Sequence, residues 1–338
     1  MSRSNHEVQS TRPSAAQALD SIEESLFFIV GAGRSGTTLL QVMLANHPEL
    51  TLPNESGFYS IIRRKNQRRL GELSTPETFK TGFDVALDFW RIRAFELDQE
   101  RVWELCQARP PSWETLFLAI LTALAEARGA LRVGEKSPRH IEFLGLLAER
   151  FPRAKFIHMV RDPRAVASSY FRTFGQRSIG AKCERWKAAI VQHERHAEAL
   201  GERYTLLRYE DLVREPEPTL RSVCTFLDCS FSEEMLNYHA RDHLGFAPNQ
   251  MHHMKNTLKP VFTSSLESWK EVLSKDQIAL VEYALGDRMA SFGYELMGLQ
   301  TRLPAATYQL HIAMDKAGRL VDKLRTAVGL EVRRRSAR

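Results

Sequence analysis

A glycine-rich segment, GAGRSGTT at residues 31–38, is the first part of this sequence that could do chemistry. It follows the apolar run LFFIV and precedes the helix-like stretch TTLLQVMLANH. In a strand–turn–helix unit of this kind, backbone N–H groups converge on the turn and the helix N-terminus adds positive potential, so the turn suits an anion. The candidate contacts are Gly33, Arg34, Ser35, Gly36, Thr37 and Thr38.

The loop departs from the nucleoside-triphosphate pattern G-x-x-x-x-G-K-[ST] at one informative position. Thr37 stands where that pattern has the lysine that reaches the β- and γ-phosphates. Arg34 offers a different cation, whose planar fork of donors suits oxyanions. The loop is therefore predicted to bind an anion without the usual triphosphate grip; the alternative is a turn that only joins a strand to a helix.

A second candidate anion site follows the apolar run at residues 155–160, in the segment MVRDPRAVASSY. Arg161 closes the predicted strand, at the edge where ligands bind in open α/β sheets. Ser169 lies about two helical turns into the next element. The two side chains can hold a second phosphate, or Arg161 can pair with Asp162 while Ser169 is an ordinary helix serine.

The two motifs, in this order and separation, resemble the sulfotransferase superfamily that uses 3′-phosphoadenosine 5′-phosphosulfate (PAPS). The form GRSGTTLL…HPEL is closer to its protein-tyrosine and carbohydrate branches than to its cytosolic small-molecule branch, which has a lysine in place of Arg34. Segments GEKSPRHIEFL and RYEDLVREPEPTLRSVCTFL agree as well, so the likeness runs from about residue 26 to residue 293.

The resemblance implies a role for each anion site. The glycine-rich loop matches the 5′-phosphosulfate loop, and Arg161 and Ser169 match the pair that holds the 3′-phosphate. Tyr209 matches a tyrosine beside the donor nucleotide, although it could equally be a core aromatic. A late donor-contacting loop would fall near residues 256–269, where Ser268 replaces the lysine of the protein-tyrosine branch.

Sulfuryl transfer also needs a cation at the leaving oxygen and a base for the acceptor. We expect Arg34 and Lys136 to stabilise the leaving group and Glu55 to be the base, with a one-residue insertion relative to the protein-tyrosine branch. The alternatives are a surface lysine and a loop or capping carboxylate. Three histidines stay in reserve as bases: His140, His252 and His253. No metal is implied, because no His/Asp/Glu cluster has ligand spacing.

Apolar runs alternating with helical patterns predict the fold. We expect an α/β domain of three layers, a mainly parallel sheet flanked by helices, of the P-loop NTPase-like sulfotransferase type. Strands are predicted at 26–30, 155–160 and 204–209, and helices at 37–47, 113–128 and 276–291. The predicted organisation is a disordered leader at 1–24, a sulfotransferase domain at 25–300 and a basic helical extension at 301–338.

The charge distribution argues against nucleic acid as a partner. The net charge is +6, and residues 301–338 contain 9 Lys and Arg against 3 Asp and Glu, so the rest is neutral. An apolar seam of heptad spacing at residues 305–328 predicts a helix that packs on its own domain, self-associates or touches an anionic membrane. With no apolar signal segment or membrane span, we expect a cytoplasmic protein.

The predicted function is direct in-line transfer of the sulfuryl group from PAPS to a hydroxyl or amine acceptor. The acceptor itself is not readable: sugar, lipid, phenol and peptide tyrosine all stay open. The competing functions are a P-loop nucleotide or small-molecule kinase and a non-catalytic nucleotide-binding protein.

Overall fold

The structure is a computed structural model of the chain. It describes residues 13–174, 178–240, 260, 263, 266–300, 302 and 304–327. Its centre is a parallel five-stranded sheet of order β2-β3-β1-β4-β5. The strands are β1 (Phe27–Gly31), β2 (Leu50–Thr51), β3 (Arg132–Lys136), β4 (Lys155–Val160) and β5 (Tyr204–Arg208). Because β1 is central and its neighbours are β3 and β4, the loops after these three strands lie at one edge of the sheet.

Helices surround the sheet, and the chain between β2 and β3 is largely helical. The first group is α1 (Ala15–Ser25), α2 (Thr37–Leu44), α3 (Arg64–Leu70), α4 (Pro76–Asp88), α5 (Trp90–Arg93), α6 (Gln99–Cys106), α7 (Trp113–Arg128) and α8 (Leu144–Arg150). The second group is α9 (Pro163–Phe174), α10 (Ile179–Leu200), α11 (Tyr209–Arg214), α12 (Pro216–Phe226), α13 (Trp269–Val272), α14 (Lys275–Ser291) and α15 (Pro304–Ala327). Short 3₁₀ or π turns occupy Phe58–Arg63, Pro138–Phe143, Gly201–Arg203, Glu233–Met235 and Tyr238–Ala240.

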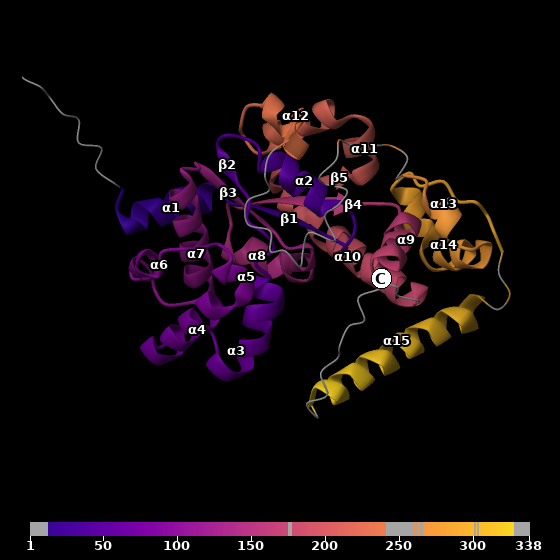
Figure 1. Ribbon diagram of the computed structural model, residues 1–338, viewed down its shortest axis with the longest axis horizontal. Helices are drawn as coiled ribbons and strands as arrows, with labels where there is room; N and C mark the ends of the chain where they lie inside the picture. Colours follow the sequence, from indigo (N-terminus) through magenta and orange to yellow (C-terminus); the bar gives the residue numbers. More distant parts are fainter. Residues whose placement is uncertain are drawn as a thin grey trace, which may run out of the picture.

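Alternation along the buried strands divides the core between two faces. Phe28 of β1 points into the larger apolar cluster, where it stacks on Phe156 of β4 with ring centroids 5.3 Å apart. Helices α1, α7, α10 and α14 close that side. Phe27 and Ile29 point into the other cluster, beneath α2, α11 and α12. Figure 1 shows these two helical layers on either side of the sheet, which is the predicted three-layer α/β architecture.

The predicted strands at 155–160 and 204–209 and the helix at 113–128 are confirmed as β4, β5 and α7. The expected disordered leader is wrong for its second half. Residues 15–25 form α1, which begins with a capping box between Ser14 and Gln17 and buries Leu19 against the core. Arg109 ties this helix down through ion pairs with Asp20 and Glu23. Residues 1–12 lie outside the described part of the chain.

Helix α15 forms where the sequence predicts a C-terminal helix. Its contacts with the domain are not made by Leu310 and Met314 of the heptad seam. Its Tyr308 hydroxyl donates to Glu184 of α10 at 2.5 Å, and the carbonyl of His311 accepts from Ser178 at 2.9 Å. Seam residues Leu310 and Met314 are instead 58% and 63% exposed. Figure 1 shows α15 at the edge of the molecule, where these two seam residues are exposed. Among the described residues, no helix is long and apolar enough to cross a membrane.

Candidate active site

The glycine-rich turn is built as the sequence predicts, between β1 and α2. Gly36 caps α2 at φ 93°, in the left-handed region that favours glycine. A Cβ on Gly36 would lie 2.2 Å from the Tyr209 ring, and one on Gly33 would lie 2.4 Å from the Tyr170 hydroxyl. The loop therefore presents bare backbone, which lets an anion approach its N–H groups closely.

Two hydroxyl residues of the turn are buried beside this backbone. Ser35 is 0% exposed, and its Oγ has no hydrogen-bond partner within the described residues. A buried hydroxyl without a partner costs free energy, which an oxyanion in the turn would relieve. Thr37 is buried as well, and Thr38 Oγ1 accepts from Lys136 Nζ at 3.3 Å. The turn therefore places buried hydroxyl groups beside its backbone N–H groups, an arrangement that suits an oxyanion.

Arg34 joins the two predicted anion motifs. Its backbone has φ 72°, a left-handed conformation that directs the side chain away from α2. Its Nε donates to Ser169 Oγ at 3.0 Å, and its Nη2 donates to Thr173 Oγ1 at 3.3 Å, both on α9. Thr173 was not predicted, although its position one helical turn after Ser169 is a usable signal. The Arg34 side chain thus lies against α9, beside the predicted 3′-phosphate residue Ser169, although Arg34 was also expected to stabilise the leaving oxygen.

The strand-end arginine lies next to the same loop. Arg161 Nη1 donates to the Arg34 carbonyl at 3.4 Å, and its guanidinium stacks 4.1 Å from the centroid of the Tyr209 ring. Burial, and secondarily the positive charge of Arg161, lower the pKa of Arg34. Two crowded guanidinium groups are an electrostatic cost that an anion between them would offset. Gly33, Gly36, Arg34, Arg161, Ser169 and Tyr209 are therefore brought together.

The Asp162 carboxylate pairs with a different arginine from the Arg161 that the sequence offered as an alternative partner. Asp162 pairs with Arg164 at 2.7 Å, and Arg164 also pairs with Glu282 at 2.7 Å. The Arg164 guanidinium lies 4.1 Å from the Trp269 ring. This buried cluster anchors the start of α9 to α13 and α14, and it fixes the helix that carries Ser169.

The predicted cation and the predicted base form a second cluster. Lys136 is the last residue of β3, and its Nζ lies 2.8 Å from Glu55 Oε1. Arg91 of α5 lies 3.2 Å from Glu55 Oε2, and it also donates to the Glu55 carbonyl at 3.3 Å. Sequence reasoning missed Arg91, because 36 residues separate it from Glu55 and no motif surrounds it.

The charge of Glu55 is stabilised by these cations. Burial raises its pKa, but the charge and hydrogen bond of Lys136 and the charge of Arg91 outweigh burial, so the net pKa lies below its ordinary value. Glu55 is about one-third exposed, whereas Lys136 is almost fully buried. The site thus combines a buried cation beside the anion loop with an ionised carboxylate that faces outward.

Of the three reserve bases, His140 is the one that lies within the described residues. His140 is 0% exposed; its Nε2 accepts the Tyr59 N–H at 3.3 Å and its Nδ1 faces Glu135 at 2.8 Å. The ring is fully enclosed in the core, so His140 is not positioned to receive an acceptor proton. His252, His253 and most of the predicted donor loop at 256–269 lie outside the described residues; Trp269 of that loop packs on Arg164.

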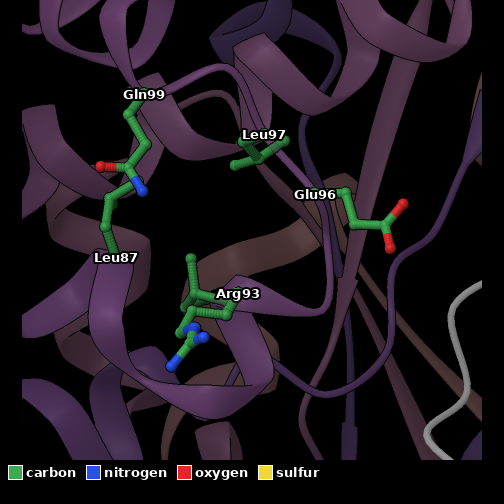
Figure 2. A pocket seen from close by; sticks show the side chains of 6 residues that line it. Leu87, Arg93, Glu96, Leu97 and Gln99 are labelled. Carbon is green, nitrogen blue, oxygen red and sulfur yellow. The ribbon is translucent and has the colours of Figure 1, made fainter.

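A cavity of about 200 Å³ opens beside α5. Figure 2 shows Leu87, Arg93, Leu97 and Gln99 around the hollow. The residues that line it are Leu87, Ile92, Arg93, Glu96, Leu97 and Gln99. None of the predicted site residues is among them, so this cavity is separate from the Lys136–Glu55 pair.

Comparisons with known proteins agree with this geometry. The model of the Sulfotransferase family matches residues 27–233. Protein-tyrosine sulfotransferase A of Caenorhabditis elegans is 25% identical over 281 residues, which are 79% of this chain and 67% of that protein. Protein-tyrosine sulfotransferase of Drosophila melanogaster is 28% identical over 64% of this chain and 40% of its own length.

A solved structure supports the fold. The sulfotransferase domain from the Synechococcus PCC 7002 olefin synthase matches 80% of this chain and 95% of its own length, at 24% identity and a TM-score of 0.58. That likeness confirms the predicted P-loop-like sulfotransferase architecture.

The relatives correct one expectation. A cytoplasmic location was predicted from the lack of a signal segment or membrane span, but the protein-tyrosine sulfotransferases that match most of the chain are Golgi membrane enzymes. The absence of a local sequence signal is therefore no guide to the compartment of this protein.

The family model covers more than half of the 338 residues, and it includes both anion motifs and the Lys136–Glu55 pair. The kinase alternative is thereby set aside. The chain belongs to the Sulfotransferase family, and it transfers the sulfuryl group of PAPS to a hydroxyl acceptor.

Proposed function

We propose that Lys136 and Glu55 are the catalytic pair of this sulfotransferase. The observation that carries the proposal is the 2.8 Å contact between them at the edge of the sheet where the anion loop ends. Lys136 also donates to Thr38 Oγ1, so its ammonium lies beside the first turn of α2. A compact cation at this place can stabilise charge that develops on the bridging oxygen of the donor.

The proposed step is a direct displacement. The acceptor oxygen forms a bond to the donor sulfur while the bond between sulfur and the bridging phosphate oxygen breaks. Glu55 takes the acceptor proton, and the leaving group is adenosine 3′,5′-bisphosphate. Catalysis then consists of positioning and electrostatic stabilisation, with no covalent intermediate on the enzyme.

We assign the donor's two ends to the two anion motifs. The bare backbone of Gly33 and Gly36, with the buried Ser35 hydroxyl, suits the phosphosulfate. Arg161 and Ser169 suit the 3′-phosphate. We assign Arg34 to this phosphate as well, because its side chain donates to Ser169 and Thr173 on α9.

The acceptor is proposed to be a phenolic hydroxyl. A carboxylate whose pKa is lowered by two cations is a weak base, and it suits a phenol of pKa about 10 better than an aliphatic alcohol. The names of the matching relatives, protein-tyrosine sulfotransferases, point to the same class of acceptor. The amine acceptors allowed by the sequence have no such support.

An acceptor panel with labelled PAPS tests the proposal. We expect label transfer to phenols and to a tyrosine-containing peptide, and at least about tenfold slower transfer to a benzyl alcohol of matched size. A preference for the alcohol would overturn the phenolic assignment. Binding of adenosine 3′,5′-bisphosphate without transfer to any acceptor would favour the non-catalytic alternative.

A further inference from the structure

A buried carboxylate lies directly behind the catalytic lysine. Glu135 precedes Lys136 in β3, and because side chains alternate along a strand the two point to opposite faces. Glu135 is 0% exposed. Its Oε1 accepts from Ser56 Oγ at 2.5 Å, from Ser137 Oγ at 2.7 Å and from the Ser56 N–H at 3.3 Å. A charged group this deep persists only where several donors compensate its lost hydration.

The second oxygen of Glu135 lies close to a buried histidine. His140 Nδ1 lies 2.8 Å from Glu135 Oε2, while its Nε2 accepts the Tyr59 N–H. The 2.8 Å separation makes His140 the close polar neighbour of this carboxylate oxygen. Burial raises the pKa of Glu135, but His140 and the hydrogen bonds from Ser56 and Ser137 outweigh burial. The net pKa of Glu135 therefore lies below its ordinary value, and the carboxylate is ionised.

These bonds hold the backbone on both sides of the catalytic pair. Ser137 Oγ, which donates to Glu135, accepts the Gly57 N–H at 3.0 Å. Ser56 and Gly57 directly follow Glu55, and Glu135 and Ser137 directly flank Lys136. The loop that presents the proposed base is thus fastened to the strand end that presents the proposed cation.

We infer that Glu135, acting through Ser56 and Ser137, is a positioning residue that sets the place of Glu55 relative to Lys136. The inference rests on the proposed function, since it requires Glu55 to act as the base. Misplacement of a reacting group by about 1 Å can reduce a rate by about 10²-fold, so a carboxylate that touches no substrate can control turnover.

The test compares kcat and donor affinity in Ser137→Ala, Ser137→Thr and Glu135→Gln. We expect Ser137→Ala to lower kcat about tenfold, with the Kd of adenosine 3′,5′-bisphosphate changed less than twofold, and Ser137→Thr to restore most of the rate. Thr122→Val is the control, because Thr122 is also fully buried but its hydroxyl makes no hydrogen bond within the described chain. Glu135→Gln is expected to lose more activity, provided that its thermal unfolding confirms a folded protein.

A double variant separates this inference from the proposed function. If Ser137 acts through the base, adding Ser137→Ala to Glu55→Gln should reduce kcat no further than Glu55→Gln alone. A further tenfold loss in the double variant, or wild-type kcat in Ser137→Ala, would overturn the positioning role. Wild-type kcat in Glu55→Gln itself would instead remove the base assignment, and with it the proposed function.

Discussion

Arg34 Nε donates to Ser169 Oγ at 3.0 Å, across 135 residues of sequence. One residue belongs to the turn after β1 and the other to the helix after β4, and these strands are neighbours in the sheet. The two anion motifs therefore lie side by side, and the Arg34 side chain connects them.

Removing the Ser169 hydroxyl should weaken binding of the 3′-phosphate specifically. We expect Ser169→Ala to raise the Kd of adenosine 3′,5′-bisphosphate about tenfold, because a hydrogen bond to a charged group is worth about 1.5–3 kcal/mol, part of which Arg34 retains. The Kd of adenosine 5′-monophosphate should change less than twofold. Isothermal titration measures both, with the neighbouring buried Ser168→Ala as the control. An equal loss for both nucleotides would contradict the assignment.

Glu55→Gln should reduce turnover without harming donor binding. The amide keeps the shape of the side chain but cannot take a proton, so we expect kcat to fall by roughly 10²-fold. Steady-state transfer kinetics and the Kd of adenosine 3′,5′-bisphosphate measure the two effects. The exposed carboxylate in the first turn of α4 supplies the control, Glu77→Gln, which should behave as wild type.

The pH dependence follows from the charges around Glu55. Its pKa lies below the ordinary value of 4.5, and a base acts only when deprotonated, so activity should be level from neutral pH down to about 5 and fall at lower pH. The same sign holds for stability, which this group supports above its unfolded pKa and stops supporting as pH falls through its folded pKa.

Arg91→Met removes one cation and should move the acidic limb of the kcat profile to higher pH. An unmoved limb would mean that Arg91 does not act on the base.

Gly36→Ala should destabilise the loop by about 1–3 kcal/mol, because φ 93° disfavours a side chain and the new Cβ would lie 2.2 Å from Tyr209. The matched control is Gly129→Ala, at φ 62° with no heavy atom within 4 Å of the added Cβ. Thermal unfolding should therefore show a larger loss for Gly36→Ala. Equal losses of thermal stability in the two variants would indicate that the Tyr209 ring can move away from the added Cβ without a measurable loss of stability.

The outward face of α15 predicts a further interaction. We propose that Leu310 and Met314, with the basic tail, bind an anionic membrane; self-association is the other partner expected from the sequence. Deleting residues 301–338 should abolish salt-sensitive pelleting with phosphatidylserine vesicles, while Leu310→Glu should weaken it and Gln309→Glu should change it less. Unchanged pelleting would exclude membrane binding by this segment. A change of oligomeric state on deletion, beyond the mass of the deleted residues, would favour self-association.

The sequence predicted the elements that carry long apolar runs, and it missed those that tertiary contacts create. Strand β1 is a continuous apolar segment and β4 (KFIHMV) is mostly apolar. Strand β3 is RVGEK, whose charged residues and glycine suggest a loop. Its Gly134 is needed because a Cβ there would lie 2.3 Å from the Phe27 ring, which no local pattern reveals. Helix α1 was missed because of its polar composition, although its capping box was readable.

The site was predicted unevenly for a related reason. Motif order identified Arg34, Arg161 and Ser169, since neighbouring strands bring their loops to one edge. The roles of Glu55 and Lys136 were predicted from family likeness, but not their ion pair. Arg91 and Glu135 had no signal, because their importance depends on contacts to residues 36 and 79 positions away.

Strand β3 carries a lysine that faces the reaction and a glutamate that faces the core, at consecutive positions. An insertion or deletion of one residue in this strand would exchange them, placing an uncompensated cation in the interior and an anion beside the donor. Length changes in β3 should therefore be forbidden during divergence. The helices between residues 64 and 112 carry no such constraint from β3; apart from Arg91 of α5, which contacts Glu55, their sequence can change while the catalytic pair stays fixed.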